Sequence, residues 1–372
     1  MCKCYPALPA RVRTDSADET ASADALHLDN PICNRLPDAL QPNSLHLNGW
    51  IMPDPLEDLT FVLTVALEET GRPGCDLDRA KILLDSCAKF VIPVCRGKFL
   101  IVTRPQDLDR LQRDLDSYQR RLEISFLDET KVCPLLDFNP DTSNEWPERN
   151  LGWYRQQLIK LATHAHVDTS FYMTLDADII FTKPLSFDRL FSGDRAIVNA
   201  ESAEDYMSVY NIETAKHEVS VKSNRYLDAE RVLQLRRCPE NENRFYGETP
   251  VILSKAIVEG LILRLEQLYR EPWPQALLRR LPWTEYPLYF LFAERRGLLQ
   301  TYHIVGGPDS ILSLSQSLWW DSKRYRDGRS LESWQVDRVF DPSSPGVAVA
   351  VQSYLGYDVA EVRAKVDPFL VR

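Results

Sequence analysis

The chain has 372 residues, of which 44% are hydrophobic and 26% are charged, so it is long enough for one large α/β domain or two ordinary ones. Its formal net charge of −10 argues against nucleic acid as a partner, because phosphate backbones are bound by clustered Lys and Arg. No uncharged apolar stretch reaches the ~18 residues that span a bilayer, so no transmembrane segment is expected.

The N-terminal segment and the cysteines indicate where the folded part of the chain begins and in which cellular compartment the protein is expected. Residues 1–50 are rich in Asp, Ser, Ala, Pro and Asn without a sustained apolar period, so a disordered N-terminal extension is expected. The first residues lack the apolar core of a signal peptide, and the eight cysteines form no CxxC pair. Reduced thiols and a cytoplasmic location, or one peripheral to a membrane, are therefore the expectation.

From about residue 58 the chain alternates short apolar runs with amphipathic segments. Strands are predicted at 61–67, at 98–103 and in "LEISFLDET", which ends near Asp128. Helices are predicted between them, in "DLDRAKILLDSCAKF" and "DLDRLQRDLDSYQRRL". This β-α-β-α-β alternation predicts a parallel sheet with helices packed on its faces.

The next predicted unit ends in a pair of aspartates. A helix is predicted in "NLGWYRQQLIKLATHAHV" and a fourth strand at 167–175, so that Asp176 and Asp178 lie at its C-terminal end. Open α/β sheets bind ligands outside the carboxyl ends of their strands, so the functional site is expected at this pair.

The remaining pattern is mixed. "IIFTKPLSFDRLF" predicts a strand, a turn and a short helix, and further strands are predicted in "DRAIVNAE", at 250–253 and in "LLQTYHIVGG". Helices are predicted after residue 253 and in "WTEYPLYFLFAERRG". Residues 201–243 have no clear period and are expected to form an insertion. The main domain is expected over 58–320, with 321–372 as a C-terminal extension that packs on it.

The spacing of Asp176 and Asp178 suits Mg²⁺ or Mn²⁺, which are hard cations that prefer oxygen ligands. Carboxylates in an apolar context need a compensating charge, and a divalent ion that also binds a diphosphate would supply it. The D-x-D spacing alone is a weak motif, because one aspartate can cap a turn while the other is solvated.

The stretch "GWYRQQLIKL" followed by "YMTLDADIIFTKPL", within residues 151–185, resembles the metal-binding segment of the GT-A glycosyltransferases. These are Rossmann-like enzymes that use nucleotide sugars, and glycogenin-like and lipopolysaccharide-type sugar transferases carry a similar stretch. More narrowly, the segment looks like a little-characterised subfamily. The resemblance implies a single GT-A-like α/β domain and a hexosyltransferase-type enzyme. It also implies a nucleotide-diphosphate sugar donor, with a UDP-sugar favoured, and a hydroxyl acceptor on a glycan, a lipid or a small molecule.

The resemblance also implies roles for individual residues. Asp176, Asp178 and His303 would hold the metal, and Glu285 would be the catalytic base of an inverting enzyme or an orienting group in a retaining one. The sequence departs from the family at the following position, where Tyr286 replaces an acidic or amide residue. The residues implied in binding the donor are Thr64, Thr103, Arg104, Gln157, Lys160, Gly247 and Glu248.

Each of these landmarks also has a structural interpretation. Gly247 can serve a tight turn, Glu285 can favour a helix N-terminus, and His303 can be a core histidine of an apolar run. Four tryptophans are candidates for stacking on sugar rings, although most tryptophans are core residues first. They are Trp153, Trp283, Trp319 and Trp320.

Two other functional classes are compatible with the aspartate pair. In a phosphatase of the haloacid dehalogenase type, D-x-D supplies a nucleophile and a general acid, but that motif follows the first strand of its domain, whereas three β-α units come first here. A non-catalytic GT-A-like binding protein is the second alternative, which the intact aspartates disfavour and Tyr286 leaves open. Neither a G-x-G-x-x-G motif nor a P-loop occurs, which argues against dinucleotide enzymes and P-loop ATPases.

Overall fold

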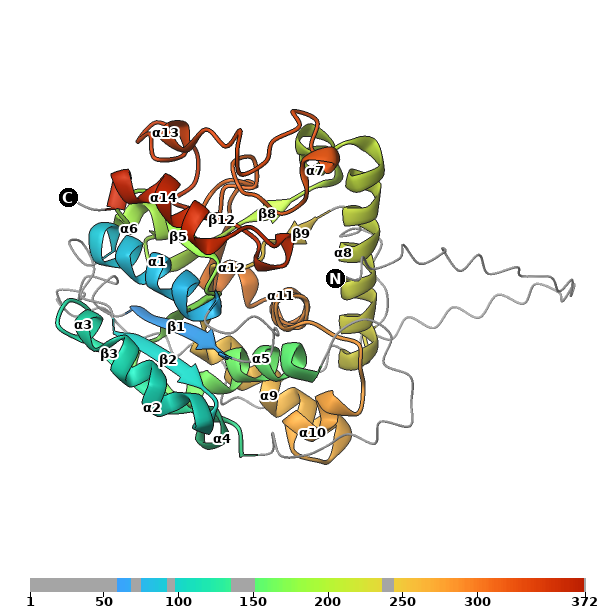
Figure 1. Cartoon of the computed structure of the whole chain (residues 1–372). Coiled ribbons are helices and arrows are strands. Elements are labelled where there is room, and N and C mark those ends of the chain that lie inside the picture. Colours follow the sequence, from blue (N-terminus) through green and yellow to red (C-terminus); the bar gives the residue numbers. More distant parts are fainter. Residues whose placement is uncertain (1–58, 68–74, 92–97, 135–150, 236–243, 371–372) are drawn as a thin grey trace, which may run out of the picture. The chain divides into compact units, whose positions relative to one another are not determined.

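The computed structural model (Figure 1) describes residues 59–67, 75–91, 98–134, 151–235 and 244–370. The disordered extension expected at 1–50 lies outside these residues. Among the described helices, none combines the length and the apolar character that crossing a membrane requires.

A five-stranded mixed sheet lies at the centre of the described chain. Its strands are β1 (Leu59–Val65), β2 (Phe99–Thr103), β3 (Ile124–Asp128), β4 (Phe171–Leu175) and β10 (Val251–Ser254). Their order is β10-β4-β1-β2-β3. The β4, β1, β2 and β3 strands pair in parallel, whereas β10 runs antiparallel to β4. The predicted α/β class with a parallel sheet is therefore confirmed, with one antiparallel strand at its edge.

Helices cover both faces of this sheet because successive strand residues point to opposite sides. Phe61 and Leu63 pack into the core on one face, while Val62 packs into the core on the other. The first face is covered by α1 (Cys75–Phe90) and α2 (Pro105–Asp114). The second is covered by α5 (Leu151–Ala162), α9 (Lys255–Tyr269) and α11 (Glu285–Arg295).

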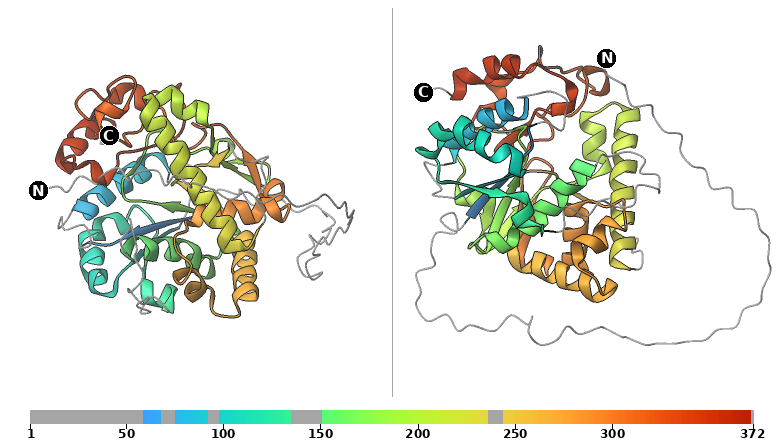
Figure 2. Two further views of the ribbon diagram at one scale, coloured as in Figure 1. Left: turned by 90° about the vertical axis from the view of Figure 1, so that its right-hand side faces the viewer. Right: turned by 60° about the horizontal axis from the view of Figure 1, so that its bottom comes forward.

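The described part of residues 201–243 is mostly helical, although its sequence shows no clear apolar period. They form α7 (Ala203–Val209) and the 22-residue helix α8 (Ile212–Leu233), which packs along α11 (Figure 2). Asn211 begins α8 by accepting a hydrogen bond from the backbone of Thr214, as an N-cap asparagine does. The buried face of α8 includes Lys222, so its apolar period is interrupted.

Shorter elements complete the structure. The remaining strands are β5 (Ile179–Phe181), β6 (Phe191–Ser192), β7 (Arg195–Val198), β8 (Ala200–Glu201), β9 (Phe245–Tyr246), β11 (His303–Val305) and β12 (Ala348–Ala350). The remaining α-helices are α3 (Asp116–Gln119), α4 (Glu129–Val132), α6 (Phe187–Leu190), α10 (Trp273–Leu278), α12 (Leu299–Tyr302), α13 (Val336–Val339) and α14 (Val359–Leu370).

The segment after residue 320 packs against both the sheet region and α1. The β12 strand pairs antiparallel with β5, which directly follows the two aspartates. The α14 helix lies beside α1 (Figure 1), where Arg363 Nη1 is 2.6 Å from Asp85 Oδ2. This segment therefore brings its residues 351–354 to the end of β4.

Candidate functional site

Asp176 follows β4 directly, at the carboxyl edge of the parallel strands. Its Oδ1 accepts a hydrogen bond from Gln156 Nε2 at 2.9 Å and lies 2.9 Å from Lys160 Nζ. Gln156 Nε2 is also 2.9 Å from Thr64 Oγ1 in β1. The structure thus places Thr64 and Lys160, two of the predicted donor-binding residues, in the surroundings of Asp176. The amide that contacts this carboxylate belongs to Gln156, which the sequence did not single out, and not to the predicted donor-binding residue Gln157.

Lys160 is buried between two carboxylates. Its Nζ is 3.2 Å from Oε1 of Glu285, the first residue of α11, and 5.2 Å from the ring centre of Tyr286. Burial alone would lower the pKa of Lys160, but the charges of Asp176 and Glu285 outweigh burial and raise that pKa well above its usual value. Lys160 therefore remains a cation and fixes the position of Asp176.

Glu285 is only 2% exposed, and the side-chain amide of Gln157 lies against its carboxylate. Burial raises the pKa of Glu285, while Lys160 acts in the opposite direction. A general base must come within hydrogen-bond reach of the proton that it removes. In this structure the carboxylate of Glu285 is engaged by Lys160 and Gln157.

The two carboxylate oxygens of Asp178 differ in their hydrogen bonding. Its Oδ2 accepts a hydrogen bond from Ser353 N at 3.2 Å, and its carbonyl oxygen accepts one from Val351 N at 3.0 Å. Its Oδ1 is buried and has no hydrogen-bond partner among the residues that the structure describes. Burial, followed by the charge of Asp176, raises the pKa of Asp178 to about 7. A nearby cation would offset both the cost of burying the charged Asp178 carboxylate and its repulsion by Asp176.

These two carboxylates fit a hard divalent cation. In the described ranges, no group of three or more His, Cys, Asp or Glu side chains comes together as a complete metal site. Mg²⁺ is nevertheless often bound through one or two carboxylates together with substrate phosphates and waters. The donor set of Asp176 and the unpartnered Oδ1 of Asp178 therefore suits an ion that arrives with a phosphate ligand.

The expectation that His303 completes the metal shell is wrong. Its Nε2 lies 2.7 Å from Tyr289 Oη, and its ring centre lies 6.4 Å from that of Phe171. Phe171 begins β4, whereas Asp176 follows the other end of that strand. Burial lowers the pKa of His303 to about 4. His303 is thus a neutral core residue that lies far along β4 from the aspartates.

Gly247 and Glu248 follow β9; Gly247 lies against Asn199, and Glu248 pairs with two cations of α8. A Cβ atom at Gly247 would be 2.6 Å from Asn199 Cβ, so close packing explains this glycine. Glu248 Oε1 is 2.6 Å from Lys222 Nζ and also pairs with Arg225. Burial alone would raise the pKa of Glu248, but these cations lower it well below its usual value. The sequence did not single out the two cations, because α8 was not predicted.

Thr103 and Arg104 lie at the end of β2, where Thr103 pairs in register with Val65 of β1. Thr103 Oγ1 is buried without a hydrogen-bond partner in the described part of the chain. The Arg104 guanidinium pairs with Asp107 Oδ2 at 2.7 Å, and Leu67 N donates to the same oxygen at 3.1 Å. Asp107 therefore connects the segment after β1 with Arg104 after β2.

Solved structures similar to this chain cover most of its length at low sequence identity. Mouse xyloside xylosyltransferase 1 has 14% identity and a TM-score of 0.44, covering 81% of this chain and 100% of that one. Galactosyltransferase LgtC, in complex with donor and acceptor sugar analogs, has 8% identity and a TM-score of 0.42. The match covers 83% of this chain and 95% of that one. A 4-diphosphocytidyl-2C-methyl-D-erythritol synthase from Anaerococcus prevotii has 13% identity and a TM-score of 0.35. The match covers 68% of this chain and 87% of that one.

These TM-scores are too low to transfer any of those activities to this chain. The similar structures include glycosyltransferases. No curated protein matches the chain significantly in sequence. The chain belongs to the family described as "Family of unknown function (DUF6492)", whose model matches residues 57–372.

Proposed function

We propose that the protein is a metal-dependent glycosyltransferase that moves a hexose from a nucleotide-diphosphate sugar to a hydroxyl acceptor. The observation that supports this most is the buried, unpartnered Oδ1 of Asp178 beside Asp176 at the carboxyl edge of the sheet. The resemblance of residues 151–185 to GT-A enzymes supports the same function independently of the geometry.

In this proposal Asp176 and Asp178 hold Mn²⁺ or Mg²⁺ against the diphosphate. When bound, the ion would neutralise the charge that develops on the leaving nucleotide diphosphate. Lys160 keeps Asp176 in position through its 2.9 Å contact. Thr64 and Thr103, at the ends of β1 and β2, are assigned to the nucleoside, and UDP is the favoured nucleotide.

The donor sugar is assigned to the loop of Gly247 and Glu248. Lys222 and Arg225 hold Glu248 in the ionised form, so it can accept hydrogen bonds from sugar hydroxyls. Glu285 is assigned to orienting Lys160, because its carboxylate is enclosed and 2% exposed. These assignments divide the site into a metal side at β4 and a sugar side at α8.

The test is release of nucleotide from sugar donors. Purified protein is incubated with UDP-glucose, UDP-galactose or GDP-mannose and a mixture of simple sugars as hydroxyl acceptors, with Mn²⁺ or with a chelator. Metal-dependent release from at least one donor is expected, with loss in Asp178→Asn and not in the control Asp194→Asn, whose side chain is exposed in a turn. The absence of release from every donor would contradict the proposal. Hydrolysis of a phosphate monoester instead would favour the phosphatase.

A further inference from the structure

Arg79 of α1 is a buried cation that no carboxylate of the described residues pairs with. The residue is 3% exposed. Its Nη1 donates to Val351 O at 3.1 Å and its Nη2 to Tyr357 O at 3.4 Å, while its Nε is buried without a partner in the ranges that the structure describes. A buried charge without an opposite charge is costly. Such an exception to ordinary core chemistry is typical of a functional site.

The two oxygens that Arg79 contacts lie at the two ends of one turn, which we call the 351–357 turn. It contains the short 3-10 helix Ser353–Leu355, which Gly356 ends in the left-handed conformation with a φ of 74°. Val351 precedes this helix and Tyr357 follows Gly356. A guanidinium presents its donors as a rigid planar fork, which a lysine ammonium lacks. One side chain of α1 therefore bridges both ends of the turn.

The 351–357 turn supplies the hydrogen bonds that Asp178 receives from the C-terminal segment. Val351 N donates to Asp178 O at 3.0 Å, and Ser353 N donates to Asp178 Oδ2 at 3.2 Å. Val351 thus contacts Asp178 through its N–H and Arg79 through its carbonyl oxygen. Since Oδ2 is occupied by the Ser353 N–H, the buried Oδ1 is the oxygen that remains for an ion.

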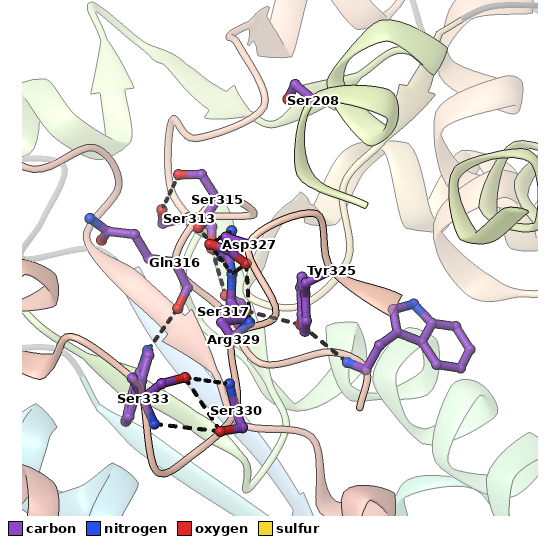
Figure 3. Close-up of polar contacts among 12 residues, drawn as sticks. Ser208, Ser313, Ser315, Gln316, Ser317, Tyr325, Asp327, Arg329, Ser330 and Ser333 are labelled. Carbon is purple, nitrogen blue, oxygen red and sulfur yellow. Dashed lines mark hydrogen bonds and ion pairs between the residues drawn. The ribbon is translucent and has the colours of Figure 1, made fainter. Parts of the chain in front are cut away.

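A second contact holds the chain just before this turn. Ser317 Oγ accepts a hydrogen bond from Ala350 N at 3.0 Å. Leu318 N donates to Ala350 O at 2.8 Å, and Gln352 N donates to Leu318 O at 2.9 Å. Figure 3 shows Ser317 in its loop. These contacts fix the backbone as far as Gln352, whereas Arg79 joins the backbone on the two sides of Ser353.

We propose that Arg79 is a positioning residue of the metal site. By bridging the ends of the 351–357 turn, it holds the Ser353 N–H against Asp178 Oδ2 and directs Oδ1 toward the ion. Groups that hydrogen-bond to metal ligands orient those ligands, and their loss costs about 10–100-fold in metal affinity. The inference rests on the proposed function, because it takes Asp178 as a metal ligand. It adds that α1 and the C-terminal segment together set the orientation of this ligand.

The variants separate the bridge from the hydrogen bond that it positions. Arg79→Lys keeps the charge and loses the fork, and Arg79→Gln also removes the buried charge, so that one folded variant of the two is enough. Ser353→Pro removes the N–H alone. Ser353 is the first residue of its 3-10 helix, and Gln352 before it has a φ of −54° and a ψ of 129°, a conformation that a following proline accepts.

Arg329→Lys is the matched control. The Arg329 guanidinium also donates to a backbone oxygen, that of Ser315, but it pairs with Asp327 at 3.1 Å and does not contact the 351–357 turn (Figure 3). Its replacement removes an arginine fork from a neighbouring loop without touching the bridge to Asp178.

The experiment is a calorimetric titration of the full chain with Mn²⁺ in excess UDP, with urea denaturation to confirm that each variant is folded. Wild type and Arg329→Lys are expected to bind Mn²⁺ equally. Each Arg79 variant and Ser353→Pro are expected to bind it about tenfold more weakly. Because Arg79 acts through the Ser353 N–H, Arg79→Gln/Ser353→Pro should bind no more weakly than Ser353→Pro alone, as residues of one network are not additive.

Amide hydrogen exchange without metal supplies a second measurement. The Ser353 amide should exchange at least tenfold faster in the Arg79 variants than in wild type or Arg329→Lys, because its turn is no longer bridged. Folded Arg79 variants with the Mn²⁺ affinity of wild type would overturn the inference alone. So would losses that multiply in the double variant, which would show that Arg79 acts without Ser353. Absence of Mn²⁺ binding by wild type would instead overturn the proposed donor site.

Discussion

Lys160 Nζ lies 2.9 Å from Asp176 Oδ1 in a setting where the lysine side chain is 3% exposed. The same nitrogen is 3.2 Å from Glu285 Oε1. One buried cation therefore connects the end of β4 with the start of α11. It holds a carboxylate of the aspartate pair in place before any ligand arrives.

Replacement of this lysine is the first prediction. Removing one partner of a buried ion pair leaves an uncompensated charge and costs about 3–5 kcal/mol, so Lys160→Met should lower the free energy of unfolding by about that amount. Urea denaturation measures the change, with Lys216→Met on the exposed face of α8 as the control. The double variant Lys160→Met/Glu285→Gln should regain part of the loss. A single variant as stable as wild type would contradict the assignment.

The second prediction concerns Asp178 without metal. Its pKa of about 7 in the folded protein lies above the usual value, so the stability that protonation contributes at low pH is lost as the pH rises to 7. Asp178→Asn does not titrate. The free energy of unfolding of the variant, relative to wild type, should therefore rise between pH 4 and pH 7, as chemical denaturation in the presence of a chelator would show. If the two proteins differed in unfolding free energy by the same amount at every pH, the raised pKa of Asp178 would be contradicted.

The third prediction concerns the effect of Mn²⁺ and UDP on the thermal stability of wild type and of Asp178→Asn. A ligand at 100 times its Kd stabilises the folded state by about 2.7 kcal/mol, so Mn²⁺ with UDP should raise the Tm of wild type. Asp178→Asn should show little or no increase, because it lacks the carboxylate with the unpartnered oxygen. Equal increases in both proteins would place the ion elsewhere.

The fourth prediction is that Gly247→Ala lowers the free energy of unfolding. The new Cβ would be 2.6 Å from Asn199 Cβ, and Asn199 is itself held by hydrogen bonds to the backbone oxygens of Pro308 and Leu312 at 2.9 and 2.8 Å. Because that side chain cannot shift easily, a loss of about 1–3 kcal/mol in unfolding free energy is expected. The matched control is Gly307→Ala, where an added Cβ meets nothing within 4 Å. Similar losses in both variants would rule out this close approach as the cause.

The fifth prediction is a pH dependence from His303, whose pKa burial lowers to about 4. The unfolded chain binds a proton near pH 6.5 and the folded protein does not, so this histidine lowers stability as the pH falls from 6.5 toward 4. Between pH 7 and pH 5 its contribution is about 2 kcal/mol. Wild type should lose that much more unfolding free energy than His303→Gln over this interval. An equal loss in the two proteins would show that His303 is accessible to protons.

Sequence patterns predicted the central strands well, since β1, β2 and β4 are buried apolar runs with clear ends. They failed for α8 because Thr214, Ala215 and Lys222 occupy its buried face in place of large apolar residues. Without α8, the ion pair of Lys222 with Glu248 could not be anticipated.

The places of the candidate site residues were predictable where position along a strand decides them. Asp176 and Asp178 follow a strand end, which sequence shows directly. The choice between Gln156 and Gln157 depends on helix rotation, and only packing settles which amide faces Asp176. His303 was misplaced because its order in the chain does not say which end of β4 it approaches. Ser353 reaches Asp178 from far along the chain, which no local pattern reveals.

The most direct test of the central claim is calorimetric binding of UDP to wild type and to Asp178→Asn, with Mn²⁺ and with a chelator. The account predicts that wild type binds UDP only with the metal and that the variant loses this binding while it remains folded. Binding of UDP that is unchanged by the chelator, or retained by Asp178→Asn, would contradict the assignment of the aspartate pair to a metal and a diphosphate.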